Sequence, residues 1–137
     1  MDVASIMSRN VITIGLDEKI QTVQELFEKH KFHHLLVIED DELVGVVSDR
    51  DILKNLSPFL STPSERIQDR TTLDKRIHQI MSRKPITIQQ ETSVEQAAEI
   101  IVQENISCLP VLSATRQIVG IVTWKDILKQ LVFLKEK

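Results

Sequence analysis

The sequence predicts a mixed α/β domain of the α+β kind, built from two βαββα halves related by pseudo-twofold symmetry. Residues 6–14 return at 80–88 with seven of nine positions identical. Residues 45–54 and 120–129 share a second pattern: a glycine, two β-branched apolar residues, a hydroxyl residue and, three positions later, an aspartate. Such self-similarity indicates duplicated supersecondary units. We therefore expect two matching repeats that pack into one module.

The first repeat has a clear order of predicted elements. Strands, which are rich in β-branched and apolar residues, are predicted at 11–14, 35–38 and 43–47. Apolar residues at helical spacing predict an amphipathic helix after the first strand: Ile20, Val23, Leu26 and Phe27. Ser48 is a favourable N-cap for the helix that closes the repeat.

The second repeat follows the same order with one additional residue. Its amphipathic helix contains Val94, Ala97, Ile100 and Ile101, and Thr92 with Glu95 has the spacing of a capping box. The offset between the copies is 74 before residues 113–117 and 75 after them, so the additional residue belongs in a hairpin loop. Pro110 has no N–H for a neighbouring strand, so its nitrogen should face an edge or a ligand.

We divide the chain into repeat 1 at 1–56, a linker at 57–70 and repeat 2 at 71–137. Pro58, Pro63 and the polar residues around them predict a surface loop in the linker. A helix through four apolar residues is expected to lead into the second repeat: Leu73, Ile77, Ile80 and Met81.

The composition favours a compact globular protein. Hydrophobic residues make up 42% and charged residues 27%, and the net charge is −3, so we expect neither disorder nor a nucleic-acid partner. The chain has no apolar run of about 18 residues and no signal-peptide pattern, which predicts no membrane association and a cytoplasmic location. The single cysteine, Cys108, lies among apolar residues and is expected to be a buried small hydrophobe.

No catalytic or metal-binding constellation is evident. The chain lacks a Gly-x-Ser-x-Gly elbow, a P-loop and a His-Glu-x-x-His motif. The acidic residues 39–42 lack the ligand pattern and glycine of an EF-hand. His30 ends a helix, whereas His33 and His34 alternate faces at the start of a strand, so the three should not converge on a metal. We expect no enzyme activity, no cofactor and no metal.

The duplicated glycine motif ends a strand at a helix N-terminus, where free N–H groups and partial positive charge suit a phosphate. Asp51 and Asp126, one turn later, are placed to accept hydrogen bonds from a ribose. The alternative is purely structural. A carboxylate in the first turn stabilises a helix by about 0.3–1 kcal/mol without any ligand, and Ser48 and Thr123 have the same ambiguity as N-caps.

The paired segments at 6–14 and 80–88, together with the paired Gly-h-h-[Ser/Thr]-x-x-Asp motifs, resemble a tandem pair of CBS domains (a Bateman module) over nearly the whole chain. In layout the chain is similar to the small acetoin-utilisation type of CBS protein. The resemblance implies a regulatory module that binds an adenine nucleotide in the cleft between the repeats, signals to a partner protein and forms a homodimer through its helices. AMP, ADP, ATP, S-adenosylmethionine and a dinucleotide all fit this expectation.

The resemblance implies two sets of nucleotide-binding residues. The repeat 1 set is Ile12, Thr13, His33, His34, Val47, Ser48, Arg50 and Asp51. The repeat 2 set is Ile86, Thr87, Pro110, Val122, Thr123, Lys125 and Asp126. The aspartates would bind the ribose, and Ser48, Thr123 and the basic residues would bind the phosphate. The base would be bordered by Ile12, Thr13, Ile86 and Thr87. Because Ser107 and Cys108 replace the two histidines, we expect repeat 1 to hold the stronger site.

Two other interpretations stay open. A dimerisation or scaffold module with vestigial sites would not respond to nucleotides, and a metal-binding protein would respond to divalent ions and chelators instead. Trp124 and the apolar residues that follow it at helical spacing predict a packing face between two chains rather than a base-stacking site. The apolar run 131–134, near the C-terminus of the sequence, supports that face.

Overall fold

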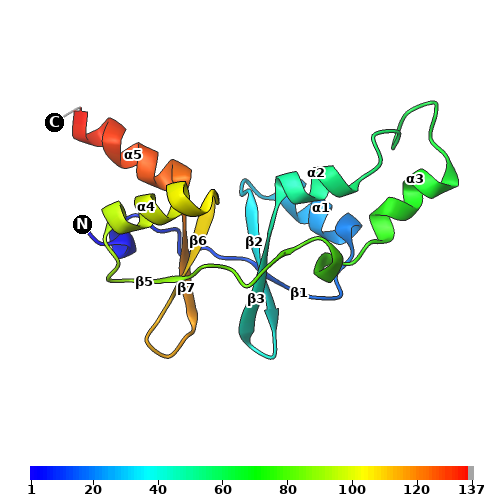
Figure 1. The fold of residues 1–137 in the computed structure, drawn as a ribbon. Helices are drawn as coiled ribbons and strands as arrows, with labels where there is room; N and C mark the ends of the chain where they lie inside the picture. The colour runs from blue at the N-terminus through cyan, green and yellow to red at the C-terminus, as the bar shows by residue number, and fades with distance from the viewer. Residues whose placement is uncertain (136–137) are drawn as a thin grey trace. The chain divides into compact units, whose positions relative to one another are not determined.

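The computed structural model describes residues 1–135, with side chains described through Val132, and it divides into two compact units (Figure 1). One unit is Ile12–Lys84, and the other joins Met1–Val11 to the chain from Pro85 onward. These units differ from the division at 1–56, 57–70 and 71–137, because the segment that precedes the first strand of each repeat packs on the sheet of the other repeat. We call these two segments, residues 1–11 and 75–84, the leading segments.

The Ile12–Lys84 unit is built on a four-stranded sheet in the order β1-β2-β3-β4. The strands are β1 Thr13–Gly15, β2 His34–Glu39, β3 Glu42–Ser48 and β4 Ser82–Arg83. Strand β1 runs parallel to β2, and the other two pairs are antiparallel. The hairpin of β2 and β3 is therefore the centre of the sheet.

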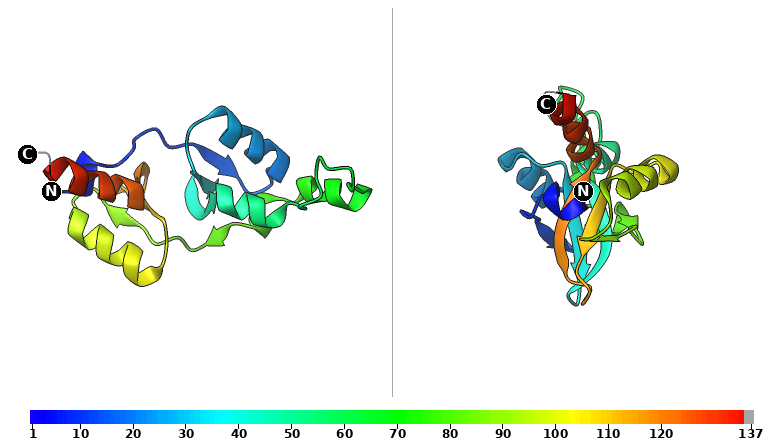
Figure 2. Two further views of the ribbon diagram at one scale, coloured as in Figure 1. Left: turned by 90° about the horizontal axis from the view of Figure 1, so that it is seen from above. Right: turned by 90° about the vertical axis from the view of Figure 1, so that its left-hand side faces the viewer.

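Two helices bury their apolar residues against this sheet: α1 Ile20–Lys29 and α2 Asp49–Asn55 (Figures 1 and 2). One core cluster contains residues from both helices and from the three longer strands: Ile14, Ile20, Val23, Leu35, Val37, Val47 and Ile52. The stripe predicted from Ile20 and Val23 is fully buried, whereas Leu26 and Phe27 are partly buried at its edge.

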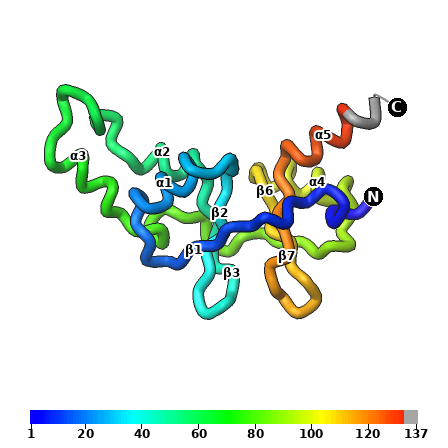
Figure 3. The backbone as a smooth tube through the Cα atoms, turned by 180° about the vertical axis from the view of Figure 1, so that it is seen from behind, coloured from blue at the N-terminus to red at the C-terminus, as the bar shows by residue number. Residues whose placement is uncertain are grey.

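The second unit repeats this plan. Its sheet has the order β5-β6-β7, with β5 Ile88–Gln89, β6 Cys108–Leu112 and β7 Ile118–Thr123, and its helices are α4 Val94–Glu104 and α5 Trp124–Lys135. A short 3₁₀ helix, η1 Val3–Ser5, adds Val3 to the core. Figure 3 shows that the N-terminal segment then runs beside β7. Cys108 is buried, as predicted. The predicted pair of mixed α/β repeats is confirmed.

The glycine of each duplicated motif is required by the other repeat's leading segment. A Cβ atom at Gly45 would lie 2.5 Å from Met81 Sδ and 2.9 Å from the Ser82 carbonyl oxygen. At Gly120 the corresponding distances, to Met7 and Ser8, are 2.6 Å and 2.9 Å. The backbones also pair, because Ser8 and Ile121 exchange hydrogen bonds of 2.9 and 3.0 Å. The same motif therefore serves one structural purpose twice, and that purpose is close backbone approach.

The hairpin loops show where the copies differ in length. Asp40 and Asp41 connect β2 to β3, and both have positive φ, as a two-residue type I′ turn requires. The β6–β7 connection is longer, and Ser113 N–H donates to the Gln117 carbonyl at 2.8 Å. The additional residue of repeat 2 lies in this loop, as predicted.

Three local predictions were wrong. Part of the predicted linker loop forms a helix, α3 Ile67–Thr71. The continuous helix expected through Leu73 and Met81 is replaced by two 3₁₀ turns, η2 Thr72–Asp74 and η3 Ile77–Gln79. The capping box of α4 is made by Ser93 and Gln96, not by Thr92 and Glu95.

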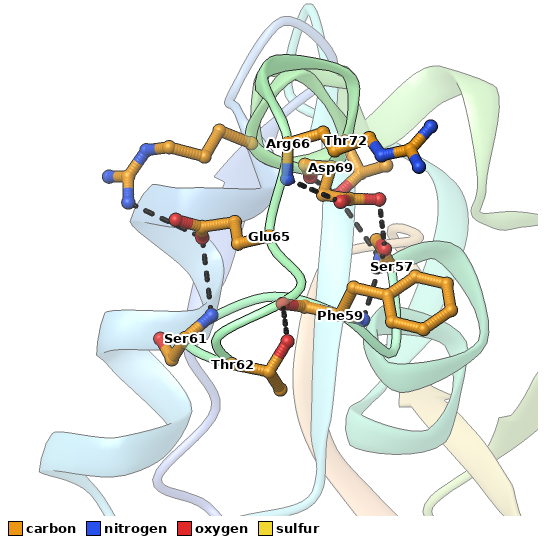
Figure 4. Close-up of polar contacts among 9 residues, drawn as sticks. Ser57, Phe59, Ser61, Thr62, Glu65, Arg66, Asp69 and Thr72 are labelled. Carbon is orange, nitrogen blue, oxygen red and sulfur yellow. Dashed lines mark hydrogen bonds and ion pairs between the residues drawn. The ribbon is translucent and has the colours of Figure 1, made fainter.

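Side-chain hydrogen bonds hold the segment around α3 together (Figure 4). Ser57 Oγ donates to Asp69 Oδ1 at 2.6 Å, Arg66 N–H donates to Asp69 Oδ2 at 2.7 Å, and Ser57 N–H donates to Thr72 Oγ1 at 3.2 Å. The hydrogen bond from Ser57, followed by that from Arg66, lowers the pKa of the Asp69 carboxyl. The linker is therefore a segment with defined structure, held by its own hydrogen bonds, and not an irregular surface loop.

Among the residues that the structure describes, no helix is both long and apolar enough to cross a bilayer.

Candidate functional site

The repeat 1 motif forms a capping box where β3 passes into α2. Ser48 N–H donates to Asp51 Oδ2 at 2.9 Å, and Asp51 N–H donates to Ser48 Oγ at 3.1 Å. Both residues are only partly buried. The box uses one carboxylate oxygen and no hydroxyl proton, so Asp51 Oδ1 and the Ser48 O–H have no partner among the described residues.

The repeat 2 motif has the same geometry where β7 passes into α5. Thr123 N–H donates to Asp126 Oδ2 at 2.8 Å, and Asp126 N–H donates to Thr123 Oγ1 at 3.3 Å. Here the Thr123 hydroxyl also lies 3.0 Å from Asp126 Oδ2 and donates to it. As in repeat 1, Oδ1 of the aspartate stays open within the described part of the chain.

These contacts show that the capping role of the motif does not exclude the predicted ligand-binding role. The cap fixes the aspartate rotamer through Oδ2, and Oδ1 remains able to accept hydrogen bonds from a ligand hydroxyl. An ordered acceptor loses less entropy on binding than a mobile one does. The capping boxes are thus compatible with a binding site and would organise one.

The structure gathers most of the repeat 1 set at one end of the β2–β3 ladder. His34 pairs with Ser48 across this ladder, and β1, which begins at Thr13, runs beside β2. Thr13 and Arg50 are exposed, Ile12 is half-buried, and Arg50 has no ion pair within the described residues. The elements of repeat 1 therefore present an open carboxylate oxygen, a hydroxyl and a cation near each other.

The structure adds Asp49, to which the sequence analysis assigned no role. Its Oδ2 lies 2.8 Å from His33 Nδ1, and its N–H donates to the His33 carbonyl at 3.0 Å. The imidazole predicted to contact phosphate is therefore already paired with a carboxylate. Residue 49 occupies a variable position of the motif, so the duplicated pattern carries no signal for its role.

The repeat 2 set differs at the strand that carries Pro110. In repeat 1, Leu36 N–H donates to the Ile12 carbonyl at 3.2 Å. Pro110 stands at the position of Leu36 and cannot make this bond. Pro110 lies in β6, the middle strand of its sheet, whereas the sequence analysis expected its nitrogen to face an edge or a ligand. The middle strand can hold a proline at this position because β5 begins only at Ile88 and pairs with Val111 and Leu112, not with Pro110. Thr87 and Lys125 are exposed.

Three predicted site residues have side chains that are unavailable to a ligand. Val47 and Val122 have no exposed surface and belong to the cores of their own units. Pro110 is also fully buried. Only backbone atoms of these residues could contact a ligand.

Other polar groups of the described residues form no second constellation. No group of three His, Cys, Asp or Glu side chains there is arranged to hold a metal ion. A polar pocket of about 430 Å³ lies at the β1–α1 turn, between Gly15, Thr22 and Arg76, and includes none of the predicted site residues.

The sequence model of the CBS domain matches residues 3–58 and 77–132, which cover both repeats. The chain belongs to the CBS domain family. The resemblance inferred from the paired motifs is therefore confirmed. A CBS domain-containing protein of Dictyostelium discoideum is 32% identical over 98% of this chain and 93% of its own length.

Two solved CBS structures that align with nearly the whole chain contain adenine ligands. The CBS pair of protein MJ0100, in complex with 5′-methylthioadenosine and S-adenosyl-L-methionine, is 29% identical over 100% of this chain and 98% of that chain, with a TM-score of 0.77. CBSX2 in complex with AMP is 27% identical over 98% of each chain, with a TM-score of 0.76. The CBS fold of this chain thus matches pairs that take adenosyl ligands with and without a phosphate.

Proposed function

We propose that this CBS pair is a regulatory module that binds an adenine nucleotide or nucleoside at its duplicated strand-to-helix motifs and signals occupancy to a partner protein. The observation that carries the proposal is the matched pair of capping boxes. In each, the backbone fixes an aspartate by Oδ2 and leaves Oδ1 open.

The signalling step requires differential affinity. A ligand shifts the equilibrium between two shapes of the pair only if it binds one shape more tightly than the other. The leading segments provide a covalent route for such a change, because each joins the sheet of one unit to the first strand of the other. The adenine ligands of MJ0100 and CBSX2 support the ligand class.

A thermal-shift panel tests the proposal directly. The chain is titrated with AMP, ADP, ATP, adenosine, 5′-methylthioadenosine and S-adenosylmethionine. Ligand at 100 times Kd is expected to stabilise the fold by about 2.7 kcal/mol, which is a shift of several degrees. Asp51→Ala and Asp126→Ala should each remove the stabilisation at their own site.

The matched control is Gln96→Ala, which removes the N3 member of the α4 capping box, as Asp51→Ala and Asp126→Ala do in theirs. It should lower the starting Tm by a similar amount, since loss of one such hydrogen bond costs about 0.5–1.5 kcal/mol, and it should keep the full ligand shift. No shift with any adenine ligand would instead favour the scaffold interpretation, and a shift with divalent ions alone would favour metal binding.

We further propose that two chains associate through α5. Its exposed stripe, Trp124, Leu128, Leu131 and Val132, has side chains between 47% and 57% exposed. The predicted contributions of residues 133 and 134 lie outside the described side chains. A contiguous apolar stripe of this kind on a small domain is typical of an interface.

Sedimentation velocity at tens of micromolar tests this association. The wild-type chain is expected to sediment as a dimer, and Leu131→Glu should shift it toward monomer because a buried unpaired carboxylate is costly. Val102→Glu, at an apolar residue of α4 that is 79% exposed and lies outside this stripe, should leave the dimer intact. A monomeric wild type would refute the α5 interface.

A further inference from the structure

The two repeats differ in charge at one structurally equivalent position. Asp49 N–H donates to the His33 carbonyl at 3.0 Å, and Trp124 N–H donates to the Ser107 carbonyl at 3.1 Å. The backbone geometry is therefore the same, but repeat 1 places a carboxylate and an imidazole where repeat 2 places an indole and a hydroxyl.

In repeat 1 this position adds negative charge beside the motif. The side chains of Asp49, Arg50 and Asp51 sum to a formal charge of −1, and those of Trp124, Lys125 and Asp126 sum to zero. Asp49 Oδ2 is held 2.8 Å from His33 Nδ1, so this imidazole nitrogen is turned toward the carboxylate and cannot bind a phosphate. Asp49 is 41% exposed at its side chain, so its charge acts on the solvent side of the motif.

Phosphate and phosphate-free ligands respond differently to this charge. AMP carries about two negative charges at neutral pH, whereas adenosine and 5′-methylthioadenosine carry none and S-adenosylmethionine bears a cationic sulfonium. A single carboxylate a few ångström from a phosphate in a partly exposed site changes affinity by about three- to tenfold. It leaves a neutral nucleoside nearly unaffected.

We propose that the His33–Asp49 pair is a specificity determinant. It makes repeat 1 select adenosyl ligands without a phosphate, while repeat 2, with Ser107 and Trp124 at these positions, takes the phosphorylated nucleotide. This inference rests on the proposed function. The sequence analysis expected the two histidines to make repeat 1 the stronger site. For phosphate-containing ligands this inference reverses that expectation, because His33 is already paired with the Asp49 carboxylate.

Calorimetric titration of single-site variants tests the assignment. In an Asp126→Ala background only repeat 1 is competent, and the ratio of AMP to adenosine affinity is measured before and after Asp49→Asn. The asparagine keeps the size of the side chain and an acceptor for His33. The ratio is expected to move toward AMP by about three- to tenfold, and the change should shrink in 0.5 M salt as the charge is screened.

The reciprocal experiment uses an Asp51→Ala background, in which only repeat 2 is competent. Trp124→Asp should lower AMP affinity relative to adenosine, and Trp124→Asn, which loses the same indole without adding charge, should not. Because the two variants lose the same apolar contact, any effect on α5 association is common to both.

The outcomes separate this inference from the function on which it rests. Unchanged AMP-to-adenosine ratios in both backgrounds, with binding intact, would overturn the selectivity and leave adenine sensing standing. Absence of binding by the wild-type chain to AMP, adenosine and 5′-methylthioadenosine would overturn both.

Discussion

Replacing Gly45 or Gly120 by alanine is expected to destabilise the chain by about 1–3 kcal/mol at each site. The reason is space, not backbone conformation, since neither glycine has a positive φ. The methionine Sδ near each added Cβ can move, but the carbonyl oxygens of Ser82 and Ser8, at 2.9 Å, belong to backbone that is paired with the strand. Relief of the clash would therefore separate the leading segment from the sheet. Chemical denaturation measures the loss.

Gly15→Ala is the matched control for both variants. It also lies in a strand, yet no atom lies within 4 Å of an added Cβ, and its φ is negative. We expect no loss, and up to about 1 kcal/mol of gain, because alanine reduces the entropy of the unfolded chain. Equal destabilisation at Gly15 and Gly45 would show that the leading segments do not set the requirement.

Ile101→Ala is expected to cost about 2–5 kcal/mol, because it opens a cavity in the core of the second unit. Ile101 is 8% exposed and packs in one cluster with Val3, Leu109 and Val122. The measurement is again the free energy of unfolding from a denaturant titration.

The adjacent residue on the same helix provides the control. Val102 is 79% exposed, so Val102→Ala removes little buried area and should change the stability by less than about 0.5 kcal/mol. Equal losses of stability at the two positions would mean that the face of α4 that contains Ile101 is not the one that packs on the core.

The strand-to-helix motifs were predictable because their structure is determined locally. The hydroxyl residue, the aspartate three positions later and the apolar strand before them specify an N-capped helix without distant partners. Ser48 and Thr123 cap the two helices as the pattern indicated, and the reciprocal bonds from their N–H groups to Asp51 and Asp126 complete a capping box that was not predicted. The packing of the leading segments on Gly45 and Gly120 depends on residues far apart in sequence, so the pattern showed the glycines but not their partners.

The continuous helix predicted through Leu73 and Met81 does not form, for a different reason. Leu73, Ile77 and Ile80 have helical spacing, but the backbone N–H groups there are taken by another segment. Ile77 N–H donates to the Glu18 carbonyl at 2.8 Å, and His78 N–H donates to the Leu16 carbonyl at 3.1 Å. These bonds to the β1–α1 turn replace the i−4 bonds of an α-helix, and spacing alone does not reveal them.

The α4 cap shows a competition between adjacent residues. Thr92 was the predicted cap, but its Oγ1 accepts from Gln89 N–H at 3.2 Å and so serves the preceding turn. Ser93 is left to accept from Gln96 N–H at 3.0 Å. Either residue satisfies the cap preference, so the sequence located the helix start but not the residue that makes the cap.

Amide chemical shifts recorded during titration with AMP and with 5′-methylthioadenosine test the central claim most directly. If the duplicated motifs bind adenine ligands, the largest changes should fall on the amides of Ser48 to Asp51 and of Thr123 to Asp126. The amide chemical shifts of residues 57–72, which include the linker, should stay unchanged. Saturable changes confined to other residues, or no changes with either ligand, would contradict the claim.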